Sequence, residues 1–187
     1  MTTTAESTAA REFVRDGFRR ALLDAADRME LTERGWIEKA TTAGHGNLQT
    51  HLTLRLVALG VDPETIFWGV RLTREPTGRW YVPDGIVVRV ENPVPAAPEA
   101  IYAGAPDLAI EILSGDPATA AGRAERERDL VEKRRAYAAR GIPHYWVVEP
   151  GARRVAWLVL DPRAGAYADR WEGPLAEAAA PWSRASR

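Results

Sequence analysis

Three consecutive stretches decide the fold: PDLAIEIL (106–113), ATAAGRAERERDLVEKRRAYAAR (118–140) and HYWVVEP (144–150). The first and third are short runs rich in β-branched and aromatic residues, which is typical of strands. The middle stretch is rich in Ala, Arg and Glu and stops at Gly141 and Pro143, so it predicts a helix of about six turns. A strand, a crossover helix and a second strand place the two strands side by side and parallel. The segment therefore predicts the centre of an α/β fold.

The flanking sequence adds further elements to this unit. Runs of β-branched and aromatic residues predict strands at 66–73, 80–90 and 154–161. Residues 36–40 predict a short strand or turn, residues 92–106 a loop, and apolar spacing predicts helices at 11–28 and 45–59. The expected architecture is a mixed central sheet flanked by helices, with an N-terminal helical extension (1–29), one main domain (30–174) ending in a C-terminal hairpin, and a flexible tail (175–187).

Composition limits the classes of function. With 187 residues, 45% of them hydrophobic, the chain can form one domain with a sizeable core. The absence of cysteine excludes a disulfide scaffold, a Cys-ligated zinc site and a thiol nucleophile. A net charge of −1 excludes binding of nucleic acid by bulk attraction. No stretch predicts a membrane span or a secretion signal, so we expect a cytoplasmic protein without a membrane partner.

Common catalytic motifs are missing from the sequence. Neither lysine follows a glycine, which excludes a Gly-Lys-Ser/Thr phosphate-binding loop, and there is no GxGxxG or GxSxG. The three histidines, His45, His51 and His144, are too scattered for a zinc-binding HExxH helix. The remaining candidates are carboxylates and the two lysines.

Two carboxylates lie in apolar surroundings. Asp84 follows a proline and precedes GIVVRV, and Glu111 lies in the middle of the strand LAIEIL. A buried carboxylate costs several kcal/mol unless it is paired or binds a metal. Glu111 therefore either occupies a surface-facing edge, pairs with an arginine of the 118–140 helix, or binds a cation.

Lysine is rare in this chain. Of 25 lysines and arginines, only Lys39 and Lys133 are lysines. Asp129, Lys133 and Tyr137 recur every four residues, which predicts either a solvated Asp129–Lys133 pair or a position that requires a compact ammonium group. Two carboxylates and one ammonium form the set that hydrolyses a phosphodiester through Mg²⁺ or Mn²⁺.

These residues resemble the Uma-two family of restriction-endonuclease-like proteins in the PD-(D/E)xK nuclease superfamily. The shared motifs are Pro83-Asp84, the run Ile110 to Ser114, the Asp129, Lys133 and Tyr137 spacing, and GIPHYWVVEP (141–150), with Glu30, Gly35 and His45-Gly46 upstream. The usual Glu-x-Lys would place lysine at position 113, where this chain has Leu113. The lysine is expected to come from the helix instead, as Lys133.

The resemblance implies a restriction-endonuclease-like nuclease domain over 30–174. It implies a metal-dependent endonuclease that contacts DNA transiently, with Asp84 and Glu111 binding Mg²⁺ or Mn²⁺ and Lys133 at the attacking water. Glu30, His45, Asp129 and Tyr137 are the accessory candidates, and a homodimer is a further expectation. The alternative is an inactive nuclease-like fold that serves as a nucleic-acid-binding or oligomerisation module.

Overall fold

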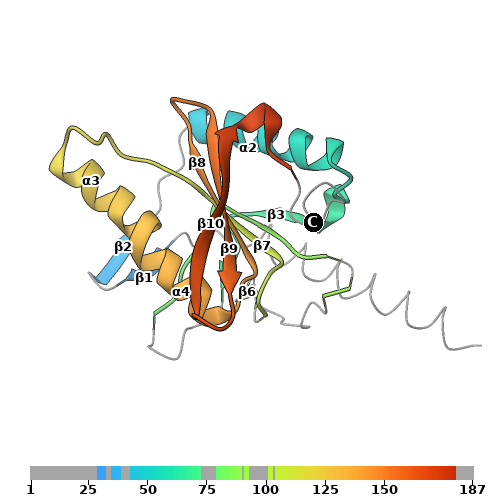
Figure 1. Ribbon diagram of the computed structural model, residues 1–187. Coiled ribbons are helices and arrows are strands. Elements are labelled where there is room, and N and C mark those ends of the chain that lie inside the picture. The colour runs from blue at the N-terminus through green and yellow to red at the C-terminus, as the bar shows by residue number, and fades with distance from the viewer. Residues whose placement is uncertain are drawn as a thin grey trace, which may run out of the picture.

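A mixed sheet lies at the centre of the computed structural model (Figure 1), which describes residues 29–32, 35–38, 43–72, 79–89, 91–92, 101–102 and 104–179. Within these residues its strands, from edge to edge, are β10 (Ala166–Pro174), β9 (Arg154–Asp161), β8 (His144–Glu149), β7 (Leu108–Ile112), β5 (Gly85–Val87) and β3 (Ile66–Trp68). β7 and β8 pair in parallel, and every other neighbouring pair is antiparallel. The predicted crossover and the C-terminal hairpin, β9–β10, are confirmed.

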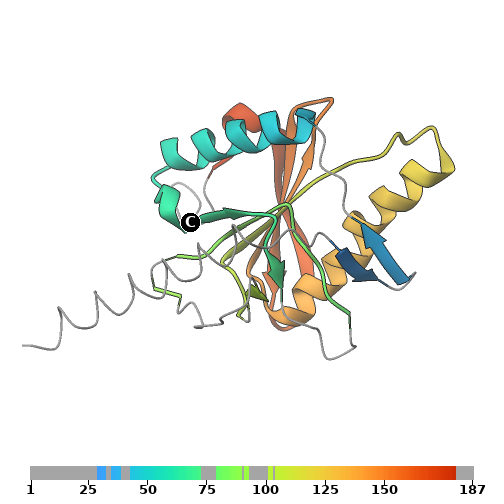
Figure 2. The same cartoon turned by 180° about the vertical axis from the view of Figure 1, so that it is seen from behind.

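Helices cover both faces of the sheet (Figures 1 and 2). They are α2 (Ala43–Ala58), α3 (Ala120–Glu127), the π-helix η2 (Arg128–Lys133) and α4 (Arg134–Arg140). Successive strand residues point to opposite faces. Accordingly, Leu108 and Ile110 of β7 pack in one apolar cluster with Leu52 of α2, whereas Ala109 packs in a second cluster with Tyr137 of α4.

Several predicted strands are shorter than the sequence pattern indicates. The run 66–73 forms β3 and β4 (Arg71–Leu72), separated at Gly69, whose φ of 67° ends the extended conformation. β4 pairs in parallel with β6 (Ile101–Tyr102), which lies inside the predicted 92–106 loop. The run 80–90 contributes only β5 to the sheet.

The N-terminal part of the described chain is a small hairpin. β1 (Met29–Thr32) and β2 (Gly35–Glu38) pair antiparallel, where only a short strand or turn at 36–40 was expected. The short 3₁₀ turn η1 (Pro63–Thr65) follows α2. The predicted helix at 11–28 lies outside the described residues, and within them no helix is long and apolar enough to cross a membrane.

The chain beyond β10 packs on the sheet. Leu175 begins the 3₁₀ turn η3 (Leu175–Glu177), and Ala178 is only 1% exposed. Arg55 of α2 donates from Nε and Nη2 to the Ala178 carbonyl at 3.0 and 2.7 Å. Residues 175–179, predicted to be flexible, therefore belong to the folded unit, because they complete the apolar layer beneath α2.

His144, at the start of β8, predicts an acid-sensitive stability. Burial lowers the pKa of His144 from 6.5 to about 4, and Trp157 Nε1 donates to its Nδ1 at 3.3 Å. Between these pH values the unfolded chain binds a proton that the folded chain does not, so stability falls as the pH drops from 6.5 to about 4. We expect the free energy of unfolding, measured with urea, to fall more between about pH 7 and about pH 5 for wild type than for His144→Gln. Equal losses in the two proteins would contradict this assignment.

Candidate active site

Lys133 lies at the centre of a buried cluster of charges. Its side chain is fully buried, and its Nζ lies 2.8 Å from Glu30 Oε1, 3.0 Å from Glu111 Oε2 and 3.2 Å from Asp129 Oδ1. These carboxylates come from β1, β7 and η2 respectively. The solvated Asp129–Lys133 pair that the sequence left open is therefore excluded, because the pair is buried and shared with two more carboxylates.

The ammonium group of Lys133 stays protonated in this cluster. Burial by itself lowers the pKa of Lys133, but the nearby carboxylates of Glu111, Glu30 and Asp129 outweigh burial and hold the pKa well above 10.5. A protonated lysine can donate hydrogen bonds but cannot accept a proton. Lys133 therefore cannot serve as a general base near neutral pH.

Glu111 is fully buried in the middle of β7, which excludes an edge position facing solvent. Tyr137 OH donates to Glu111 Oε1 at 2.6 Å, and Lys133 donates to Oε2 at 3.0 Å. Burial, followed by the charge of Glu111, raises the pKa of Tyr137 well above 10, so Tyr137 remains a neutral donor. Two donors on one face of the helix therefore fix the orientation of the Glu111 carboxylate.

Asp84 lies next to Glu111 across the ladder. Gly85 pairs with Ile110, and extending this antiparallel register by one residue places Asp84 opposite Glu111. Residues directly opposite each other share a face, with Cβ atoms about 5 Å apart. Asp84 Oδ2 accepts a hydrogen bond from the Ile112 amide at 2.6 Å, which ties it to the same strand. The sheet therefore brings the two predicted metal ligands together on its α4 side.

The accessory candidates Glu30 and His45 also belong to this region. His45 Nε2, at the start of α2, lies 3.6 Å from Asp84 Oδ1. Glu30 is fully buried and accepts from the Val82 amide at 3.0 Å, in addition to its contact with Lys133. Glu30, an accessory candidate from the sequence, lies in the centre of the cluster because the β1–β2 hairpin carries it there.

A π-helical turn positions the helix side of the site. The predicted 118–140 helix begins after Thr119, whose hydroxyl accepts from the Gly122 amide, but it changes to a π-helix from Arg128 to Lys133. Such turns are rare and often lie at functional sites. Here Tyr145 OH of β8 donates to the Asp129 carbonyl at 2.8 Å. The wide turn places Asp129 and Lys133, both buried, toward the sheet.

Comparisons with known proteins agree with this geometry. A family model named Uma2, described as “Putative restriction endonuclease”, matches residues 16–174. The chain belongs to the Uma2 family. The match confirms the resemblance seen in the sequence, and it begins within the segment 1–29 that was predicted as an extension. Among curated proteins, none matches the chain.

One solved structure similar to this Uma2 protein is described as “a putative nuclease belonging to DUF820 from Anabaena variabilis ATCC 29413”. The two chains are 21% identical, with a TM-score of 0.52, and the similarity covers 71% of this chain and 72% of the other. At this level of identity the similarity establishes the fold, which is that of the mixed sheet with its flanking helices.

Arg128 is a site residue that the sequence did not single out. It is 8% exposed, and its Nε lies 3.5 Å from Glu30 Oε2 and 3.7 Å from Asp129 Oδ1. Within the described part of the chain, this buried Nε has no hydrogen-bond partner. The Uma2 protein therefore places a second buried cation beside Lys133. Nothing in the sequence distinguishes Arg128 from the other arginines of the same helix.

The oxygen ligands of this site fit a hard divalent cation. In the described ranges no group of three or more His, Asp or Glu side chains is arranged to hold a metal, and Lys133 takes the space between three carboxylates. Mg²⁺, however, keeps several of its waters and commonly needs only one or two protein carboxylates. Asp84 and Glu111 are the two carboxylates that would hold such an ion here.

Proposed function

We propose that this Uma2 protein hydrolyses phosphodiester bonds of DNA with Mg²⁺ or Mn²⁺ bound by Asp84 and Glu111. The observation that carries the proposal is the hydrogen bond from the Ile112 amide to Asp84 Oδ2, which holds Asp84 against β7 next to Glu111 and its buried, protonated lysine partner. When bound, the cation would polarise the scissile phosphate and lower the pKa of a bound water. The family description and the fold both support a nuclease.

The charged side chains around the two ligands have separate roles in this proposal. Lys133 stabilises the negative charge that develops at the attacked phosphate, as a fixed donor in a dry site. Lys133 Nζ donates a hydrogen bond to Glu111 Oε2 and forms ion pairs with Glu30 and Asp129, and these contacts hold the ammonium group in place. Arg128 provides a second positive group for a phosphate oxygen.

Metal binding is the first test of this function. We expect Mn²⁺ at about 100-fold above its Kd to raise Tm by about 5–10 °C, because a ligand that binds only the folded state stabilises it by mass action. The rise is larger at neutral than at acidic pH, where protons compete for the carboxylates. Calorimetric titration and melting curves would compare wild type, Asp84→Asn and Asp169→Asn, whose carboxylate is 86% exposed. Wild type and Asp169→Asn bind Mn²⁺, and Asp84→Asn does not.

DNA cleavage is the second measurement on the same proteins. Wild type and Asp169→Asn nick plasmid or single-stranded DNA in Mn²⁺, and Asp84→Asn is inactive while it keeps its folded melting transition. If wild type binds Mn²⁺ but cleaves neither form of DNA, the proposed hydrolase activity is refuted. That result would favour the binding-module alternative.

A further inference from the structure

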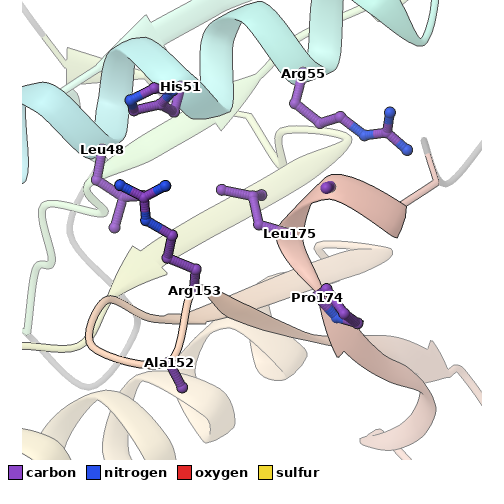
Figure 3. Close-up of a pocket in the computed structure, with 8 residues that line it drawn as sticks. Leu48, His51, Arg55, Ala152, Arg153, Pro174 and Leu175 are labelled. Atoms are coloured by element: carbon purple, nitrogen blue, oxygen red, sulfur yellow. The ribbon is translucent and has the colours of Figure 1, made fainter.

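A pocket lies on the other face of the sheet from the candidate active site. It has a volume of about 400 Å³ and lies between α2, the β8–β9 turn and η3 (Figure 3). Leu48, Pro174 and Leu175 form apolar parts of its lining, and Leu48 belongs to the apolar cluster on the α2 side. Small-molecule sites are typically concave, apolar and of about 300–1,000 Å³, with a few polar groups that orient the ligand.

The polar groups of this pocket are basic. His51 and Arg55 come from α2 and Arg153 comes from the β8–β9 turn, and none of the described residues that line the pocket is acidic. Arg55 is held by the Ala178 carbonyl. In Figure 3 the Arg153 guanidinium extends beneath α2, beside Leu48 and toward His51. No carboxylate of the described chain pairs with Arg153, whereas the next residue, Arg154, pairs with Glu172 at 3.1 Å. The pocket therefore has an uncompensated positive rim.

Arg153 occupies a backbone conformation that favours glycine. The β8–β9 loop reads Pro-Gly-Ala-Arg (150–153), and the β9–β10 loop reads Pro-Arg-Ala-Gly (162–165). The fourth residue of each loop is left-handed, with φ of 46° at Arg153 and 63° at Gly165. The second loop has glycine at this position, and the first has arginine. Strain of this kind, kept where glycine would avoid it, is a feature of functional sites.

The strained turn is fastened to the wall of the pocket. The Arg153 amide donates to the Pro150 carbonyl at 3.2 Å, and the Leu175 amide donates to the Arg153 carbonyl at 2.8 Å. These bonds fix the direction in which the Arg153 side chain leaves the backbone. The backbone of Arg153 is therefore set before any ligand arrives, and binding has to order only its exposed side chain.

We infer that this pocket binds a small organic anion, with an apolar body against Leu48, Pro174 and Leu175 and a phosphate or carboxylate group between Arg153 and His51. The apolar lining contributes affinity by burial, and the guanidinium contributes charge-assisted hydrogen bonds. The inference goes beyond the proposed nuclease and does not depend on it, because the pocket and the carboxylate cluster lie on opposite faces of the sheet.

The decisive variant exchanges the two loop residues, Gly151→Arg with Arg153→Gly. It keeps the net charge and gives the first loop the sequence of the second. A Cβ at Gly151 meets no atom within 4 Å, so an arginine fits there. We expect Tm to rise by about 2–4 °C, because glycine relieves the left-handed strain. We expect ligand affinity to fall, because the guanidinium leaves the pocket.

Binding is measured by calorimetry with phenyl phosphate, inorganic phosphate and phenol. Wild type is expected to bind phenyl phosphate at least about tenfold more tightly than either of the others, and the exchange variant to lose about tenfold or more. Arg153→Asn, which tolerates the left-handed conformation, should lose affinity equally, while Arg163→Ala in the other loop should retain it. A deoxynucleoside 5′-monophosphate that binds more tightly than phenyl phosphate would identify nucleotides as the source of the anion, and weaker binding would indicate smaller anions.

Three results would overturn the inference. The first is no binding of phenyl phosphate to wild type. The second is equal binding of phenyl phosphate and inorganic phosphate, since that reflects surface charge alone. The third is equal affinity of wild type and the exchange variant, since Arg153 would then have no part in recognition.

Discussion

Replacing Lys133 by methionine is expected to lower the free energy of unfolding by about 3–5 kcal/mol and to abolish the proposed hydrolysis of DNA. Methionine has similar length but no charge, so Glu30, Glu111 and Asp129 would lose the ammonium group that all three contact. Uncompensated buried carboxylates are costly, and Arg128, whose contacts are with Glu30 and Asp129 at 3.5 Å or more, compensates them only in part. Urea unfolding and plasmid nicking measure the two effects.

Two further measurements test whether this position requires lysine: the pH dependence of stability and the effect of Lys133→Arg. The pKa of Lys133 is raised above 10.5 by its partners, so its stabilising contribution is fully present below pH 10.5 and is lost as the pH rises toward the folded-state pKa. Lys133→Arg keeps the charge but places a larger, planar group in a fully buried position, and should cost about 1–3 kcal/mol and most of the activity.

The control for both variants is Arg135→Met on the exposed side of α4, which should change stability by less than about 0.5 kcal/mol. A Lys133→Met variant as stable and active as Arg135→Met would show that the buried cluster contributes neither to folding nor to function.

The strand–helix–strand centre was predictable because its signals are local. The segments 106–113 and 144–150 are apolar and short, and the helix between them stops at Gly141, whose φ of 81° provides the left-handed C-cap. The break at Gly69 was not predictable, because glycine also occurs inside strands. The π-turn was missed for a related reason: its residues, RDLVEK, are ordinary helix formers, and only contacts with β7 and β8 distinguish the wide turn.

The candidate site was predictable where a residue conflicts with its surroundings. Glu111 is a charge in an apolar strand, and Lys133 is one of two lysines in an arginine-rich chain. Arg128 is one of several arginines in the same helix, so its residue type does not distinguish it. The central place of Glu30 depends on how the β1–β2 hairpin packs against residues some fifty positions later in the chain, such as Val82, and a local pattern carries no information on that packing.

Glu111→Gln is expected to reduce hydrolysis by at least about 100-fold while the protein remains folded. The amide has the shape of the carboxylate and can still accept a hydrogen bond from Tyr137 OH. It lacks the negative charge that faces Lys133 and that would bind the cation. Because Glu30 and Asp129 remain to pair with Lys133, the loss in unfolding free energy should be only about 1–2 kcal/mol. The control is Glu132→Gln, which makes the same change at a neighbouring carboxylate; Glu132 accepts a hydrogen bond from the Tyr81 hydroxyl at 2.8 Å, and the amide can still accept it.

The double variant Glu111→Gln with Lys133→Met separates pairing from packing. In the absence of the ammonium group, Glu111 is a buried carboxylate beside two others, so its neutralisation should stabilise the protein rather than destabilise it. The loss in unfolding free energy of the double variant should therefore be smaller than the sum of the losses of the two single variants, by about 2–3 kcal/mol. Urea unfolding of wild type, the two single variants and the double variant measures this difference. Additivity within about 0.5 kcal/mol would mean that Lys133 and Glu111 do not stabilise the folded protein as a charge pair.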